Sequence, residues 1–219
     1  PDNCSIMRIQ RLEFNMFPVN SYIVWDDKTG ESAIIDAGCY YPKEQETLLQ
    51  FIQENKLQVK YLLATHLHLD HNFGNPFTAR TFHVPLEAAR EDEFLLANMP
   101  EQANMFGISL PESPIPIGKY IKEGDTFMLG NESLNALHVP GHSPGSMVFY
   151  APDSGFVISG DTLFMSSIGR ADLPGGNYEQ LVKAINDKIM TLPSDTVVYP
   201  GHGPETNVYR EKKYNPYMQ

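Results

Sequence analysis

Residues 64–71 read Ala-Thr-His-Leu-His-Leu-Asp-His and place three histidines and one aspartate within six residues. The cluster follows a short apolar run, which predicts a strand that ends at the first of these side chains. Residues two apart in an extended chain project to the same side, so His66 and His68 can bind one cation together. Asp70 and His71 are adjacent and cannot easily join that face. We therefore expect a turn to direct them to a second, neighbouring ion.

Three later segments each place one further candidate ligand where an apolar run ends. They are residues 139–146 (Val-Pro-Gly-His-Ser-Pro-Gly-Ser), 158–162 and 197–204, and their candidate ligands are His142, Asp161 and His202. A single histidine or aspartate in a loop is more often a surface residue or a helix cap. Five of the seven histidines fall in these motifs, however, and imidazole with carboxylate suits zinc or iron. Together the motifs predict a site for two metal ions.

In this order the seven side chains resemble the ligand pattern of the metallo-β-lactamase superfamily, and the resemblance covers nearly the whole chain. Residues 160–164 (Gly-Asp-Thr-Leu-Phe) and 168–176 are further similar to glyoxalase II in its short bacterial form, a hydroxyacylglutathione hydrolase. The resemblance assigns His66, His68 and His142 to a first metal, Asp70, His71 and His202 to a second, and Asp161 to both.

The resemblance implies an α+β fold, an αββα sandwich of two mixed β-sheets with helices on the outer faces. At 219 residues the chain has the length of one such domain, spanning 1–219. Apolar patterning predicts strands at residues 6–14, 20–26, 31–36, 59–64, 81–84, 125–130, 132–138, 147–151, 155–159 and 196–199. Helices are predicted after Tyr41, within residues 85–106, and after Asn177, with an irregular connection over 111–118. This order is not the strict alternation of a parallel βαβ fold.

Composition narrows the function and the compartment. The net charge of −11 argues against a nucleic-acid partner, because phosphate binding requires a basic surface. The apolar runs are too short to span a membrane, and no secretory signal is visible, although a segment removed before Pro1 stays an alternative. With only Cys4 and Cys39, a disulfide scaffold is not expected, and we predict a cytoplasmic protein. Cys39 follows a predicted strand and is either a thiol ligand or, as we favour, a small buried side chain.

Other side chains have two interpretations each. The apolar residues within 85–106 either form the wall of a substrate channel or pack on the sheet, and we favour packing. These residues are Phe94, Leu95, Met99, Met105 and Phe106. His83 and His138 lie outside the ligand motifs, and we expect His83 to be structural or exposed.

The predicted chemistry is metal-dependent hydrolysis. Two zinc ions that share a carboxylate lie roughly 3.5–4 Å apart, and a zinc-bound water has a pKa near about 7, so a metal-bound hydroxide can attack a carbonyl. We expect zinc, with iron or manganese as alternatives, and Asp70 as a catalytic residue besides its role as a ligand. The metals leave the cavity locally positive, which favours an anionic thioester. Arg170 occupies the position at which glyoxalase II carries a basic residue that contacts glutathione, and its alternative role is to cap the adjacent loop.

The resemblance implies S-D-lactoylglutathione as substrate, but glyoxalase II has a further C-terminal helical segment that contacts glutathione. Here only residues 203–219 follow His202, which leaves a different thioester as an alternative. Three other functions stay open. They are a persulfide dioxygenase-like oxidoreductase with one iron, a lactonase or β-lactamase, and a metal-binding module without activity. The oligomeric state is not predicted.

Overall fold

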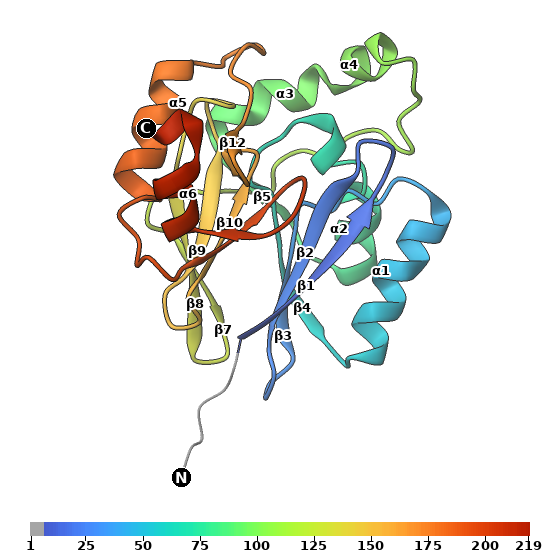
Figure 1. Ribbon diagram of the computed structural model, residues 1–219. Helices are drawn as coiled ribbons and strands as arrows, with labels where there is room; N and C mark the ends of the chain where they lie inside the picture. The colour runs from blue at the N-terminus through green and yellow to red at the C-terminus, as the bar shows by residue number, and fades with distance from the viewer. Residues whose placement is uncertain (1–6) are drawn as a thin grey trace.

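The computed structural model describes residues 7–219, and Figure 1 shows two β-sheets packed face to face between outer helices. The first sheet has the strand order β1-β2-β3-β4-β5-β6 and the second has the order β14-β13-β10-β9-β8-β7. Each sheet contains parallel and antiparallel pairs. The predicted αββα sandwich of two mixed sheets is therefore confirmed. Cys4 and Ile6, the first residue of a predicted strand, lie outside the described residues.

The first half of the chain builds the first sheet and its helices. Its strands are β1 (Met7–Phe14), β2 (Val19–Asp26), β3 (Glu31–Ile35), β4 (Gln58–Leu63), β5 (Leu86–Ala88) and β6 (Lys119–Tyr120). Its helices are α1 (Pro42–Glu54), η1 (Leu69–His71), α2 (Asn75–Phe82), η2 (Arg90–Asp92), α3 (Glu93–Ala97) and α4 (Met99–Met105). Strands β1, β2 and β3 pair antiparallel, whereas β3 to β6 pair parallel, and β1 forms one edge. The α3–α4 segment lies across the top of the molecule in Figure 1.

The second half builds the second sheet. Its strands are β7 (Thr126–Leu129), β8 (Glu132–His138), β9 (Met147–Ala151), β10 (Phe156–Gly160), β13 (Val197–Pro200) and β14 (Thr206–Asn207), with a separate hairpin of β11 (Leu163–Phe164) and β12 (Ser167–Ile168). Its helices are α5 (Tyr178–Lys188), α6 (Val208–Tyr214) and η3 (Pro216–Met218). As predicted, Asn177 caps α5, since its side chain accepts a hydrogen bond from Gln180 N.

Three apolar layers hold the sandwich together. Between the sheets, the rings of Tyr22 and Phe149 pack with aliphatic side chains of both sheets. Outside the first sheet α1 buries Leu48 and Ile52, and outside the second sheet α5 buries Leu181 with its neighbours. Each such side chain contributes about 1.5–3 kcal/mol when removed from water. None of the described helices is both long and apolar enough to cross a membrane.

The strand predicted at residues 81–84 is wrong. Thr81 and Phe82 instead end α2, which begins at Asn75 with Pro76 in its first turn, where proline is tolerated. His83 adopts the left-handed conformation (φ 56°) and ends the helix, so the next strand begins at Leu86. Phe82 packs against the outer face of the first sheet, and this contact outweighs the strand preference of the run Thr-Phe-His-Val. The other predicted strands, the helices after Tyr41 and Asn177, and the irregular connection over 111–118 are confirmed with shifts of one or two residues at their ends. Within 85–106 the helices begin only at Arg90, because Leu86–Ala88 form β5, which pairs with β4 and β6.

Candidate metal centre

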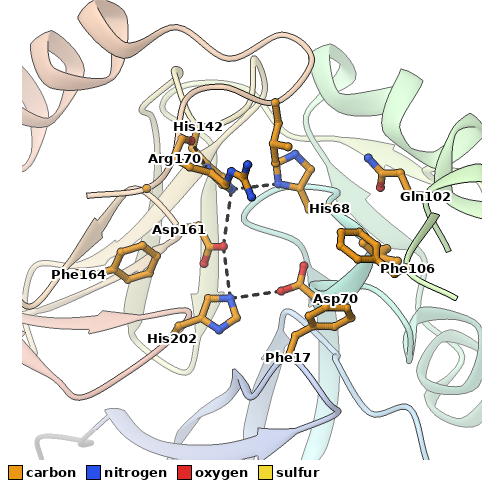
Figure 2. Close-up of a pocket in the computed structure, with 13 residues that line it drawn as sticks. Phe17, His68, Asp70, Gln102, Phe106, His142, Asp161, Phe164, Arg170 and His202 are labelled. Atoms are coloured by element: carbon orange, nitrogen blue, oxygen red, sulfur yellow. Dashed lines mark hydrogen bonds and ion pairs between the residues drawn. The ribbon is translucent and has the colours of Figure 1, made fainter. Parts of the chain in front are cut away.

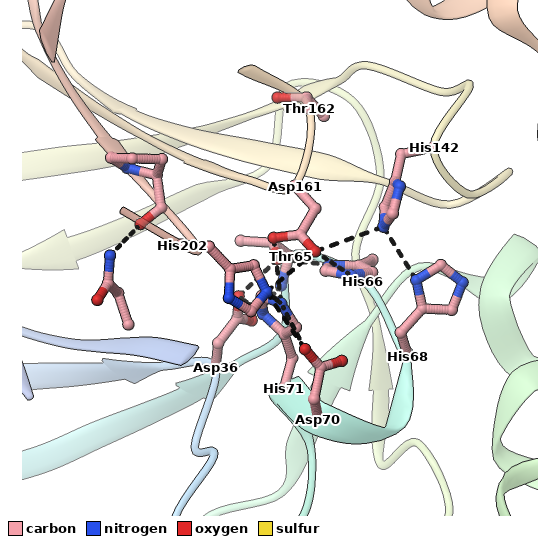
Figure 3. A network of polar contacts seen from close by, with 12 residues as sticks. Asp36, Thr65, His66, His68, Asp70, His71, His142, Asp161, Thr162 and His202 are labelled. Carbon is pink, nitrogen blue, oxygen red and sulfur yellow. Dashed lines mark hydrogen bonds and ion pairs between the residues drawn. The ribbon is translucent and has the colours of Figure 1, made fainter. Parts of the chain in front are cut away.

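The loops that follow β4, β8, β10 and β13 meet at one edge of the sandwich, and they carry all seven predicted ligands. Figure 3 shows these side chains pointing toward one another from both sheets. Three sets have ligand atoms within 4.8 Å of one another, and two of them consist only of predicted ligands, while the third is Asp36, His66 and His71. We call His66, His68 and His142 the first ligand group, and Asp70, His71, Asp161 and His202 the second ligand group.

The first ligand group is buried. The β4 strand ends at Leu63, and the extended backbone after it presents His66 and His68 to the same region, as predicted. His142 comes from the loop between β8 and β9 and completes the set. Its Nε2 lies 3.0 Å from Nδ1 of His68, so the imidazole nitrogens of separate loops face one another.

The second ligand group is more open and contains two carboxylates. The turn η1 directs Asp70 and His71 away from the first two histidines, as the sequence predicts. Nε2 of His202 lies 3.2 Å from Oδ2 of Asp70 and 3.3 Å from Nε2 of His71. The side chain of His202 is 31% exposed, whereas that of His71 is fully buried.

Asp161 lies between the two groups. Its Oδ2 is 3.8 Å from Nε2 of His66 and 3.6 Å from Nε2 of His142, and its Oδ1 is 3.1 Å from Nε2 of His71. Gly201 allows this placement, because a Cβ atom there would lie 2.4 Å from Oδ1 of Asp161. The two oxygens of Asp161 thus face ligand nitrogens of both groups.

The donor set fits divalent metal ions. A tetrahedral zinc ion with bonds of about 2.0–2.1 Å separates its ligand atoms by about 3.3 Å, and the separations given above range from 3.0 to 3.8 Å. Nε2 of His66 is buried without a hydrogen-bond partner among the described residues, although it faces Asp161 and the first ligand group. A buried nitrogen of this kind normally has a partner, and a cation would supply one.

The histidines of the two groups have opposite pKa shifts. Burial lowers the pKa of His66 well below its usual value and lowers that of His68 to about 4. Burial also acts to lower the pKa of His202, but hydrogen bonds with Asp161 and Asp70 raise it to about 10. Burial thus favours neutral imidazoles at His66 and His68, whereas His202 is paired with carboxylates.

Asp36 supports the second ligand group from behind. Its carboxylate accepts hydrogen bonds from the backbone N–H of Thr65 (2.7 Å) and from Oγ1 of Thr65 (2.6 Å), and its Oδ2 lies 2.9 Å from Nδ1 of His71. A carboxylate on the far nitrogen fixes the ring and the tautomer of a histidine ligand. Sequence reasoning missed this role, although Asp36 follows directly after a predicted strand.

Two further histidine ligands are held by backbone carbonyl groups, while Nδ1 of His66 lies 2.9 Å from Oγ1 of Thr65. Nδ1 of His142 lies 2.8 Å from the carbonyl oxygen of Arg170, and Nδ1 of His202 lies 3.0 Å from that of Pro18. The main chain of Arg170, rather than its side chain, therefore contacts the ligand set.

A cavity of about 500 Å³ opens above the two groups. Figure 2 shows its lining, with Phe17 and Phe106 on one side of the ligands and Phe164 on the other. The non-ligand lining consists of Phe17, Leu69, Gln102, Phe106, Phe164, Gly169, Arg170 and Leu173. Phe17 and Phe106 meet edge to face with ring centroids 5.4 Å apart, so the wall opposite the ligands is apolar.

Five apolar residues from 85–106 were candidates for this wall, and only Phe106 lines it. Leu95 and Met99 are buried against neighbouring elements, as favoured above, whereas Phe94 and Met105 are exposed. No sequence motif marks Phe17 or Gln102, which reach the cavity from distant segments.

Arg170 lines the cavity, but its side chain is 61% exposed. It forms two hydrogen bonds with Asp172, of 2.7 Å from Nε and 2.9 Å from Nη2. The aspartate balances much of the positive charge that the sequence alone places at the cavity mouth.

The other residues considered from sequence take structural positions. Cys39 is buried, burial raises the pKa of its thiol to about 12, and it joins neither ligand group. His83 is exposed at the end of α2. Nε2 of His138 lies 2.8 Å from the carbonyl oxygen of Pro144 and thus contacts the loop of His142.

An αββα sandwich with two ligand groups around a shared aspartate defines a metal-dependent enzyme class. Residues 15–202 match the family described as the metallo-beta-lactamase superfamily. The chain belongs to the metallo-β-lactamase superfamily.

Three proteins are similar to this chain over nearly its full length. The hydroxyacylglutathione hydrolase GloC of Haemophilus influenzae is 36% identical over 97% of this chain and 98% of its own length. The crystal structure of BLEG-1 B3 metallo-beta-lactamase has a TM-score of 0.87 at 28% identity, covering 97% of this chain and 100% of that one. TTHA1623, solved in a di-iron-bound form, has a TM-score of 0.83 at 32% identity, covering 95% and 99%.

Proposed function

We propose that the protein is a thioester hydrolase of the hydroxyacylglutathione hydrolase type, with two divalent metal ions, zinc in the first place, in the two ligand groups. The observation that carries the proposal is the position of Asp161 between both groups at the floor of an open cavity. The similarity to a hydroxyacylglutathione hydrolase over nearly the full length supports the same reaction. Iron and manganese are the alternative metals, and the di-iron form of TTHA1623 supports iron among them.

Bound in these groups, divalent cations lower the pKa of water and polarise a carbonyl oxygen. The chain's own residues then have separate roles. The first ligand group and His71 hold their ions from buried, fixed positions, whereas Asp70 lines the cavity. Asp70 is the carboxylate placed to orient the attacking water and to accept its proton, which agrees with its predicted catalytic role.

The cavity wall indicates the shape of the substrate. The apolar faces of Phe17 and Phe106 suit the hydrocarbon part of an acyl or thiol group. Arg170 uses Nε and Nη2 for Asp172, so its Nη1 is not committed to that pair and is the atom that we expect to bind an anionic group of the substrate. We therefore expect a thioester that combines an apolar section with one negative charge, with S-D-lactoylglutathione as the first compound to test.

The decisive experiment is a substrate panel with metal content measured on the same sample. The panel contains glutathione thioesters, acyl thioesters of smaller thiols, lactones and a β-lactam. Two metal ions per chain and the highest kcat/KM on a thioester support the proposal. Turnover of lactones or β-lactams at a higher kcat/KM than every thioester would overturn it.

One observation favours a second candidate, an oxidoreductase of the persulfide dioxygenase type. His66, His142 and Asp161 form a set of two histidines and one carboxylate, a combination that also suits a single non-haem iron. Oxygen consumption with a persulfide substrate and one iron per chain would establish this alternative. Hydrolysis without oxygen uptake would exclude it.

A further inference from the structure

Asp92 is a buried carboxylate outside both ligand groups. It is the last residue of η2 and directly precedes α3, and its exposed fraction is 0%. No lysine or arginine among the residues that the structure describes forms an ion pair with it. A buried carboxylate without a cationic partner is costly, so its hydrogen bonds must compensate for the loss of water.

Three donors surround the Asp92 carboxylate, and all of them belong to loops that carry ligands. Its Oδ2 accepts hydrogen bonds from the backbone N–H of Leu67 (3.1 Å) and from Oγ of Ser143 (2.8 Å). Its Oδ1 accepts a hydrogen bond from the backbone N–H of Gly145 (2.6 Å). Leu67 lies between His66 and His68 in the sequence, and Ser143 follows His142. One side chain thus joins the two loops that build the first ligand group.

The loop that carries His142 has a sequence that allows this contact with Asp92. A Cβ atom at position 145 would lie 2.8 Å from both Cγ and Oδ1 of Asp92, so a glycine is needed there. Ser143 and Ser146 also approach each other, with 2.7 Å between their Oγ atoms, and this contact holds the Ser143 hydroxyl beside Asp92. Burial raises the pKa of Asp92, and its three hydrogen bonds act against that rise.

The first ligand group needs such support more than the second. In the second group, Asp36 contacts the His71 ring directly. In the first group, Nε2 of His68 is buried without a hydrogen-bond partner among the described residues, so nothing fixes this ring from its far side. The position of His68 therefore depends on its backbone, which the Leu67 N–H ties to Asp92.

We propose that Asp92 is a positioning residue that clamps the two loops of the first ligand group together and thereby sets the metal affinity of that group alone. The inference rests on the proposed metal centre but not on the identity of the substrate. Outer partners of metal ligands typically change metal affinity by about 10–100-fold. Here the partner acts on the loops and touches no ligand side chain.

The test replaces Asp92 by asparagine, which keeps the volume but puts an amide NH₂ group where one oxygen accepts a hydrogen bond. In either orientation of the amide, at least one of the three donors loses its acceptor. Two further variants, each of which disables one ligand group, allow Zn²⁺ binding by the other group to be measured on its own. His202→Ala leaves the first group intact, and His142→Ala leaves the second group intact. Zn²⁺ affinity is measured in each by competition with a chromogenic chelator.

We expect Asp92→Asn to weaken Zn²⁺ binding by about 10–100-fold in the His202→Ala background. In the His142→Ala background the change should stay within about twofold. Equal losses in both backgrounds, or no loss in the first, would overturn the role of Asp92. If the wild-type chain binds no Zn²⁺ at all, the metal centre itself is wrong, so the two failures are distinguishable.

Two further variants separate positioning from general destabilisation. Ser143→Ala removes only one of the three hydrogen bonds, so it should weaken the same affinity by less and carries the test if Asp92→Asn does not fold. Glu211→Gln alters another fully buried carboxylate, which accepts hydrogen bonds from Ser166 N and Thr206 Oγ1 and lies in neither group. It should lower the free energy of unfolding without changing Zn²⁺ affinity. An equal loss of Zn²⁺ affinity in Glu211→Gln would show that Asp92 affects metal binding only through the stability of the fold.

Discussion

Both ligand groups contain histidines, but different contacts orient the rings of these histidines. In the first, burial lowers the pKa values of His66 and His68, and its geometry depends on the backbone of two loops. The second holds imidazoles that touch carboxylates, and Asp36 fixes one of its rings directly. The difference teaches that a ligand set can be oriented either through its main chain or through its side chains. The four predictions below test that contrast.

Asp161→Ala should have the largest effect, because it removes the carboxylate whose two oxygens approach ligand nitrogens of both groups. We expect kcat/KM on the best thioester to fall by at least about 100-fold, together with metal content. His83→Asn is the matched control, since asparagine tolerates the left-handed conformation at this exposed position and the residue belongs to neither group. Similar activity losses in the two variants would remove the basis for a shared carboxylate.

Asp36→Asn should affect the second ligand group selectively. The amide cannot reproduce all the bonds to Thr65 and His71, so Zn²⁺ affinity should fall by about 10–100-fold where only the second group is intact. The same change should have a smaller effect where only the first group is intact, because Asp36 reaches His66 only through Oγ1 of Thr65. Glu132→Gln, a buried carboxylate on β8 that accepts a hydrogen bond from Ser154, serves as the control. A loss of first-group affinity as large as that in the second would contradict the contrast.

The stability of the protein after metal removal by a chelator should fall on both sides of pH 6.5. His202 has its pKa raised from 6.5 to about 10, so its stabilisation is complete below pH 6.5 and is lost as the pH rises towards 10. His68 has its pKa lowered to about 4, so protons bind the unfolded chain more tightly and stability falls as the pH drops from 6.5 towards 4. Urea unfolding across this range measures both limbs. His202→Ala should weaken the dependence of the free energy of unfolding on pH above 6.5, and His68→Ala should weaken it below 6.5. The opposite result, in which each variant changes the other pH range, would contradict the pKa shifts given for the two histidines.

Phe106→Ala should have the smallest effect, because the ring lines the cavity without contacting either group's ligand atoms. We expect KM for thioesters with an apolar section to rise by about tenfold or less, with kcat nearly unchanged. Met105→Ala is the control, since this neighbouring side chain is 80% exposed and does not line the cavity. A fall in metal content in Phe106→Ala would show that the wall and the ligand groups are not independent.

The fold could be predicted mostly where apolar periodicity is long. Strands such as β1 and β8, and the capped helix α5, were recognisable because seven or more residues follow one period. The two-residue strands β6, β11, β12 and β14 carry no period and were missed. The strand expected at residues 81–84 failed because packing of Phe82 decided the local structure. That the chain forms one domain over 1–219 stays a prediction.

The convergence of the seven predicted ligands could be inferred because each follows a strand, and strand ends meet at one edge. Their roles as ligands, and those of Asp70 and Arg170, stay predictions. The supporting roles of Asp36 and Asp92 could not be predicted from the sequence. In a chain of net charge −11, the residues next to an aspartate do not indicate whether its carboxylate is buried. Phe17 and Gln102 reach the cavity only through tertiary packing, which no short motif encodes.

The exposed side of β1 has a consequence for solubility. This eight-residue strand at the edge of the first sheet has one row of backbone groups that no other strand within residues 7–219 occupies, and such an edge can recruit further strands. Arg8, Arg11 and Glu13 are exposed along it, so a chain adding itself here would have to desolvate several charges. The edge is thereby protected against aggregation, and neutral apolar substitutions at these three positions would remove that protection without altering the metal centre.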